Sequence, residues 1–206
     1  VMVPETVKFN LVGKLPEGVY ARDLILTIIG EVGANGCNYQ VMEFTGEGAK
    51  TLTISDRIAL CNMAVEAGAK TGIFEVDDVA MEYLKEHGRE PKAVYHSDPD
   101  AHYVREYTFD LSKVEPVVAK PDFVDNLAPA KDVRGIKIDA GAIVMNPNCS
   151  VCWGSCQGVI GENEVLISTG TRNFKGRAGH PSSKVYLGSA ATVTASAIAG
   201  EIALAS

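Results

Sequence analysis

Residues 6–32 read TVKFNLVGKLPEGVYARDLILTIIGEV, and this stretch decides the fold class. Its first part, Thr6–Gly13, alternates apolar and polar side chains and is rich in β-branched residues, which is typical of a half-buried strand. A Pro-Glu-Gly turn follows, and residues 21–32 carry apolar side chains at helical spacing until Gly33 ends the run. A strand that leads directly into a helix predicts an α/β architecture.

The alternation of strand and helix patterns continues along the chain. Further strands are predicted at residues 39–44, 103–111, 142–145 and 164–168, and further helices at 55–69, 76–87 and 190–205. Scattered prolines and polar breaks in residues 112–135 predict a linker or an extended crossing segment. We therefore expect layered α/β domains: residues 1–118 as one, 119–139 as the crossing segment, and 140–206 as the remainder of a second.

Composition and charge exclude several classes of protein. The 206 residues are 46% hydrophobic and 22% charged, which is ordinary for a globular protein. Nineteen basic against 26 acidic residues give a net charge of −7, which argues against a nucleic-acid partner, including a regulatory RNA. No apolar run approaches the roughly 20 residues that span a bilayer, so no membrane partner is expected. The absence of a secretory signal pattern predicts a cytoplasmic location, and the non-Met start fits a piece of a longer protein.

A cysteine pair gives the sharpest chemical signal, in the sequence Asn146-Pro147-Asn148-Cys149-Ser150-Val151-Cys152. A tight turn brings two thiolates at this spacing to one side, where they can bind zinc or an iron–sulfur cluster or form a redox dithiol. Structural zinc needs four protein ligands, and a second such pair is absent. The alternative is two small hydrophobic residues packed in a turn. Cys156, four residues further on, fits packing better than ligation.

Two other stretches combine functional side chains. Residues 171–177, TRNFKGR, hold two arginines and a lysine beside Asn and Gly in an acidic chain. The planar guanidinium binds a carboxylate through two hydrogen bonds, so this loop suits a small polycarboxylic acid, with a solvated basic loop as the alternative. In CNMAVEAGA, Asn62 and Glu66 are four residues apart and would share one face of a helix. A half-buried Glu66 could act as a general acid or base, although such a pair is more often structural.

In this order, EFTGEGAKTLTISDRIALCNMAVEAGAKTG, NPNCSVC and TRNFKGR resemble the aconitase family. Within it, the chain looks most like the large-subunit branch formed by 3-isopropylmalate dehydratase and homoaconitase. The resemblance runs from VPETVKF to IAGEIA, nearly the whole chain. It implies aconitase-like layered α/β/α domains, present here as a partial set.

The resemblance implies a hydro-lyase that isomerises a hydroxy acid by removing water and adding it back. The expected reaction converts 2-isopropylmalate to 3-isopropylmalate in leucine biosynthesis. Family members use a [4Fe–4S] cluster with one open iron and act with a small, swivel-domain subunit. The residues that match family positions are Cys149 and Cys152 (cluster ligands), Arg172 and Arg177 (substrate carboxylates), Glu66 (active-site carboxylate), and Asn62 and Thr171 (cluster lining). Thr171 stands where the family often has Asn.

The chain also departs from the family pattern. The third cluster cysteine of the family lies in a Gly-Ser-Cys-Thr-Asn stretch, but here Asp139 is followed directly by Ala140. The family's N-terminal His-Asp and Asp-Ser-His-Thr motifs are also missing. We therefore expect a full-length enzyme seen in part, whose 206 residues are inactive alone. The alternatives are a homoaconitase large subunit and a truncated scaffold without catalysis.

Overall fold

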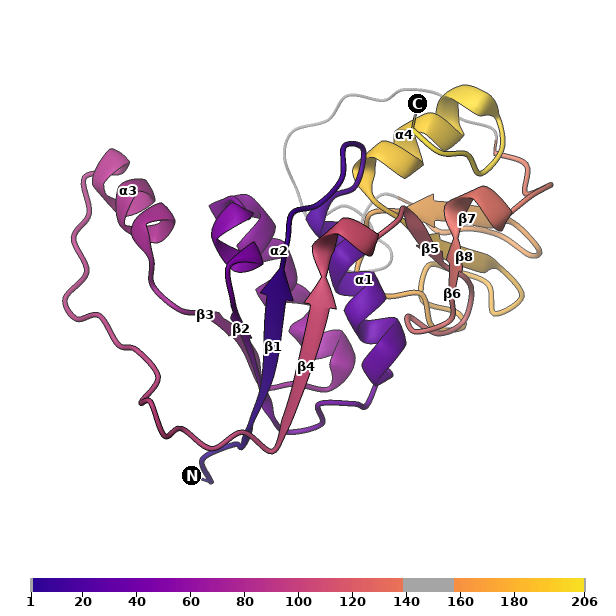
Figure 1. Ribbon diagram of the computed structural model, residues 1–206. Helices are drawn as coiled ribbons and strands as arrows, with labels where there is room; N and C mark the ends of the chain where they lie inside the picture. Colours follow the sequence, from indigo (N-terminus) through magenta and orange to yellow (C-terminus); the bar gives the residue numbers. More distant parts are fainter. Residues whose placement is uncertain (1, 139–157, 206) are drawn as a thin grey trace. The chain divides into compact units, whose positions relative to one another are not determined.

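Figure 1 shows the computed structural model of the chain, which describes residues 2–138 and 158–205. The chain forms two compact units, and each is discontinuous in sequence. Unit 1 comprises Val1–Pro16 and Asn35–Val114, and unit 2 comprises Glu17–Ala34 and Glu115–Ser206. Both contain helices and a sheet, so the α/β class is confirmed. The division into 1–118, 119–139 and 140–206 stays a prediction.

Unit 1 is built on a parallel sheet of order β3-β2-β1-β4. Its strands are β1 (Thr6–Val12), β2 (Val41–Thr45), β3 (Thr71–Phe74) and β4 (Arg105–Asp110). Figure 1 shows β1 and β4 side by side, although nearly a hundred residues separate them in sequence. Parallel strands need crossover connections, and the connection from β2 to β3 contains the helix that carries Asn62.

In unit 1, the helices α2, α3 and η3 begin directly after a capping side chain, which is Thr53, Asp77 or Asp110. They are η1 (Gly48–Thr51), α2 (Ile54–Met63), η2 (Ala64–Ala67), α3 (Asp78–Glu86) and η3 (Leu111–Lys113). At the start of α2, the Thr53 hydroxyl accepts from the Asp56 N–H at 3.2 Å, and the Asp56 carboxylate accepts from the Thr53 N–H at 2.9 Å. This reciprocal capping box satisfies backbone donors that the first helical turn leaves open.

Aromatic rings form the centre of the unit 1 core. Phe9 and Phe44 are fully buried, with ring centroids 5.6 Å apart. Phe44 stacks on Phe74 at 5.0 Å, and Phe9 stacks on Tyr107 at 5.4 Å. These residues occupy paired positions on neighbouring strands, so the parallel register itself brings the rings into contact.

Unit 2 contains a mixed sheet of order β6-β5-β8-β7. Its elements are α1 (Ala21–Val32), β5 (Val117–Ala119), β6 (Leu127–Pro129), η4 (Ala130–Asp132), β7 (Val165–Ser168), β8 (Lys184–Leu187) and α4 (Ala190–Ala199). Strand β5 runs antiparallel to β6 and β8, whereas β7 and β8 are parallel. Val118, Tyr186 and Ile202 belong to one buried cluster of this unit.

Helix α1 is tied to the sheet of unit 2 by a buried carboxylate. Asp23 is fully buried and accepts from the backbone N–H of Tyr20 at 3.0 Å and of Val117 at 3.1 Å. Burial raises the pKa of this carboxyl above its usual value. Gly30 lets the helix approach closely, because a Cβ there would lie 2.5 Å from the side chain of Leu127. Helix α1 thus packs against β5 and β6, which lie about 90 residues or more further along the chain.

Several predicted elements differ from those observed. Residues 112–135 are not a plain linker, because they form η3, β5, β6 and η4 and contribute the buried Val118 and Ala130. The helix predicted over 55–69 ends at Met63, and that over 190–205 ends at Ala199, where Gly200 takes a left-handed conformation. Strands β3 and β8 were not predicted as separate elements, because they are short and their apolar runs carry little alternation. The strand predicted at 142–145 lies outside the described residues.

Candidate active site

The basic sequence 171–177 forms part of the loop that connects β7 to β8 in unit 2. Arg172 is exposed, whereas Thr171 and Arg177 are half-buried. The guanidinium of Arg177 lies over the ring of Phe174, 5.5 Å from its centroid. Stacking on an aromatic face orients a guanidinium and leaves its edge able to bind a carboxylate.

The beginning of this loop is held by hydrogen bonds to backbone groups. The Ser168 hydroxyl accepts from the Gly170 N–H at 2.8 Å. Arg22, from the first turn of α1, donates to the carbonyl oxygens of both Thr169 and Gly170. Helix α1 therefore positions the residues directly before Thr171 and Arg172.

The middle of the loop is anchored by Asn173, which is only 2% exposed. Its side-chain amide donates to the carbonyl oxygens of Lys120 at 2.8 Å and of Phe123 at 3.2 Å. Near the end of the loop, Gly179 pairs with Ile160, whose carbonyl oxygen would lie 2.1 Å from a Cβ at Gly179. Arg172 and Arg177 are therefore presented by a fixed loop, not by a freely moving one.

Asn62 and Glu66 lie in unit 1, where α2 gives way to the 3₁₀ helix η2. Asn62 is exposed in the last turn of α2, and Glu66 is half-buried in η2. Three residues per turn replace 3.6 at this junction, so the predicted single helical face does not continue unbroken from Asn62 to Glu66. The loop before β2 fixes η2, because the Cys37 and Tyr39 N–H groups donate to the Ala67 and Gly68 carbonyls at 2.9 and 3.0 Å.

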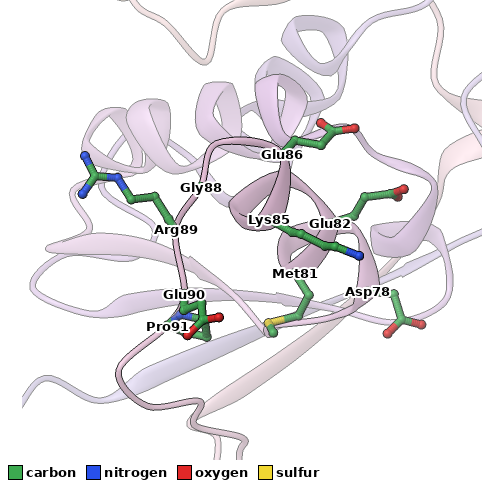
Figure 2. Close-up of a pocket in the computed structure, with 9 residues that line it drawn as sticks. All are labelled: Asp78, Met81, Glu82, Lys85, Glu86, Gly88, Arg89, Glu90 and Pro91. Carbon is green, nitrogen blue, oxygen red and sulfur yellow. The ribbon is translucent and has the colours of Figure 1, made fainter.

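Two hollows flank the helices of unit 1. One, of about 460 Å³, is lined mainly by apolar side chains of α2, β3 and α3, and Cys61 and Asn62 are among its lining residues. The other, of about 1170 Å³, lies between α3 and residues 88–91, as Figure 2 shows. It is lined by a single continuous segment of chain and contains none of the predicted site residues. We therefore assign it no role.

The predicted cluster ligands Cys149 and Cys152 lie outside the described residues. Within the described part of the chain, Cys37 is buried and Cys61 is half-buried, and burial raises the pKa of both thiols. A neutral thiol is a poor metal ligand, because the thiolate is the form that binds. No group of three or more Cys, His, Asp or Glu side chains that could hold a metal occurs in residues 2–138 and 158–205. The described residues do not complete a three-cysteine cluster site.

The predicted site residues thus fall into two groups. Asn62 and Glu66 belong to unit 1, whereas Thr171, Arg172 and Arg177 belong to unit 2. Sequence reasoning missed Arg22, because its partners lie 147 and 148 residues away and its helix offers no local signal for them. The anchoring role of Asn173 was also missed, because nothing in the basic motif 171–177 indicates that this polar side chain is buried.

Taken together, the structure is that of a mixed α/β protein in which an anchored loop carries two arginines. The family model described as "Aconitase family (aconitate hydratase)" matches residues 1–137 and 124–200. The chain belongs to the aconitase family.

Curated relatives agree with this assignment. The chain is 38% identical over 257 residues to "3-isopropylmalate dehydratase large subunit 1" of Methanopyrus kandleri, a match that covers 97% of this chain and 62% of the relative. It is 38% identical to the 3-isopropylmalate dehydratase large subunit of Acetivibrio thermocellus, covering 97% and 61%, and 36% identical to large subunit 2 of Archaeoglobus fulgidus, covering 98% and 62%. The chain therefore spans about 60% of the length of these relatives.

The matched region itself is interrupted. It extends over 257 residues of alignment although this chain has only 206, so the relatives carry residues there that have no counterpart here. The family model is likewise matched in two pieces, which meet in residues 124–137. That junction lies just before Asp139 and Ala140, where the Gly-Ser-Cys-Thr-Asn stretch of the family was expected.

No helix in the described ranges is long and apolar enough to cross a bilayer.

Proposed function

We propose that this chain is the large-subunit part of a hydro-lyase that isomerises 2-isopropylmalate to 3-isopropylmalate by dehydration and rehydration. The observation that carries the proposal is the fixed basic loop, in which Asn173 and Arg22 anchor the backbone around Arg172 and Arg177. A dicarboxylic acid has two groups that suit two guanidinium forks. The names of the relatives support the same substrate class.

In this proposal, each residue has one role. Arg172 and Arg177 bind the substrate carboxylates and set its orientation, and Glu66 is the active-site carboxylate that moves a proton. Asn62 and Thr171 line the cofactor site. Cys149 and Cys152 are two of three ligands to a [4Fe–4S] cluster, which would supply Lewis-acid chemistry to the substrate hydroxyl. No cysteine of this sequence matches the third ligand position, because Asp139 is followed directly by Ala140.

The proposal also includes a partner and a location. A small, swivel-domain subunit would complete the site, as the words "large subunit" in the names of the relatives suggest. We expect the assembly to act in the cytoplasm.

The first experiment measures activity. The 206-residue chain is reconstituted anaerobically with iron and sulfide and assayed with isopropylmalate, with and without a small subunit. We expect no turnover in either case, because two matching thiolates are too few for a stable open cluster. Turnover by the 206 residues alone would refute this expectation.

The second experiment measures substrate binding without turnover. Isopropylmalate is titrated into the chain and into Arg172→Met and Arg177→Met by calorimetry, with Lys131→Met as a control at an exposed lysine of the same unit. Losing one charge-assisted contact weakens binding by roughly tenfold. If both arginine variants bind as the control does, the loop is not the carboxylate site.

Two alternatives remain open to test. A homoaconitase large subunit would prefer a tricarboxylic acid in the same titration. A truncated scaffold without catalysis is favoured by the missing matched residues and the missing third cysteine. The intact mass of the protein expressed from its gene distinguishes the scaffold from the enzyme. A product of 206 residues supports the scaffold, and a longer product supports the enzyme.

A further inference from the structure

A second basic feature of unit 2 is a cleft of about 420 Å³. It is formed by the β5–β6 connection, the end of the β7–β8 loop and the first part of β8. Neither Arg172 nor Arg177 lines it. Its volume lies within the range of small-molecule sites, roughly 300–1,000 Å³.

Cationic side chains dominate the lining of this cleft. Lys120, Lys175 and Lys184 line it with a single carboxylate, Asp122. No ion pair involves these three lysines in the described ranges of the chain. The residues between Glu164 and Glu201 include no Asp or Glu at all, in a chain of net charge −7. Lys175 and Lys184 therefore lie in a segment that has no acidic side chain of its own, whereas Lys120 lies close in sequence to Asp122.

The walls of the cleft are held by backbone hydrogen bonds. The Lys120 carbonyl accepts from the buried amide of Asn173 at 2.8 Å, and its N–H donates to Asn126 at 2.8 Å. The Lys184 N–H donates to the Glu164 carbonyl at 2.9 Å at the start of β8. Two of the three lysines thus project from fixed backbone, which lowers the entropic cost of binding a ligand between them.

Neutral donors complete the lining. The hydroxyl of Ser182 accepts from the Asn163 N–H at 3.0 Å and contacts His180 Nδ1 at 2.8 Å, so its position is fixed. Tyr186 also lines the cleft, is 7% exposed, and has a phenol whose pKa is raised by burial. Ammonium and hydroxyl donors together suit a ligand rich in acceptor oxygens.

We propose that this cleft binds a small anion of charge −2 or greater, carrying carboxylate or phosphate groups, at a site separate from Arg172 and Arg177. Three lysines against one aspartate leave a lining that favours such a charge. The inference does not depend on the proposed reaction, because it needs neither the cluster nor a partner subunit. Lys175 lies between the two arginines in sequence, so the cleft and the arginine loop share one segment of the chain.

The test is calorimetric titration of the 206-residue chain with tricarballylate and, separately, with inorganic phosphate at constant ionic strength. We expect saturable binding of at least one anion, weakened roughly tenfold by Lys120→Met and by Lys184→Met, because each removes one charge-assisted contact. Lys131→Met, a lysine already paired with Glu115 at 2.5 Å, should bind as the parent chain does. Tighter binding of tricarballylate identifies a carboxylic acid as the ligand, and tighter binding of phosphate identifies a phosphate.

Two results would overturn the inference. One is an absence of saturable binding of both anions to a chain whose circular dichroism shows it folded. The other is binding that Arg172→Met abolishes and the lysine variants leave intact, which would place the anion on the arginine loop. The second result would leave the proposed function standing, so the two proposals fail separately.

Discussion

Replacing Asp77 by Asn tests whether one buried ion pair holds the helical layer of unit 1 together. The Arg57 guanidinium meets the Asp77 carboxylate through two hydrogen bonds of 2.7 Å, and only 6% of the Arg57 side chain is exposed. The same guanidinium donates to the carbonyls of Leu52 at 3.2 Å and Ala49 at 3.1 Å. Arg57 thus links α2, the turn before it and the start of α3.

The expected loss follows from the burial of the arginine. Arg57 stays charged in the Asp77→Asn variant, and a buried charge that loses its partner costs about 3–5 kcal/mol. The Asp77 side chain is 18% exposed, and two carbonyl contacts to Arg57 survive, so the lower part of this range applies. Asn caps a helix about as well as Asp, so the contact of Asp77 with the Ala80 N–H adds little. We expect a loss of about 3 kcal/mol in the free energy of unfolding.

Urea unfolding followed by far-ultraviolet circular dichroism measures this loss. The matched control is Glu106→Gln, which breaks the Lys8–Glu106 pair at 3.6 Å. The Glu106 side chain is 61% exposed, so the control should lose no more than about 0.5 kcal/mol. Equal losses in the two variants would contradict the assigned role of Arg57.

The same variant has a characteristic pH dependence. The hydrogen bonds from Arg57 lower the pKa of the Asp77 carboxyl below its usual value. The pair therefore contributes its full stability above the pKa of an unfolded Asp, about 3.9, and loses it as the pH falls through the lower folded value. The difference between the parent chain and Asp77→Asn should narrow in this acid range. A difference that stays constant through it would refute the charge-based explanation.

Three further predictions concern unit 2. Asp23→Ala removes the acceptor of two buried N–H groups and should cost about 2–4 kcal/mol in urea unfolding. Burial raises the pKa of Asp23, so its pH dependence is opposite to that of Asp77. The free energy of unfolding of the parent chain should fall as the pH rises from the unfolded pKa of Asp23 through its higher folded pKa. Asp23→Asn should remove this dependence of stability on pH. Asn173→Ala should weaken isopropylmalate binding, because it releases the loop that holds the arginines. The control Ser112→Ala, at an exposed residue of unit 1, should leave isopropylmalate binding unchanged. Gly179→Ala should unfold at lower urea than Gly88→Ala, since both positions have positive φ but only Gly179 has a carbonyl 2.1 Å from the added Cβ.

Local pattern was sufficient wherever the determining interactions lie close in sequence. The predicted helix over residues 21–32 agrees with α1, and the strand at Thr6–Gly13 agrees with β1 to within one residue. The Thr53–Asp56 capping box is equally local, because its two partners are three residues apart in sequence. Three motifs in order, the stretch 43–72, NPNCSVC and TRNFKGR, identified the family, which the comparisons confirm.

The tertiary structure decided what depends on distant contacts. Periodicity describes which face of an element is apolar, but not which sheet that face meets, so α1 could not be assigned to the unit that contains β5. Asp23 reaches its partner Val117 across 94 residues, and Arg22 reaches Gly170 across 148. These polar side chains look like surface residues in the sequence, because burial and pairing arise only when separate segments pack together. The strand and helix patterns of the sequence determined its fold class and its motifs identified its family, whereas only the packing of distant segments determined which residues hold the arginine loop in place.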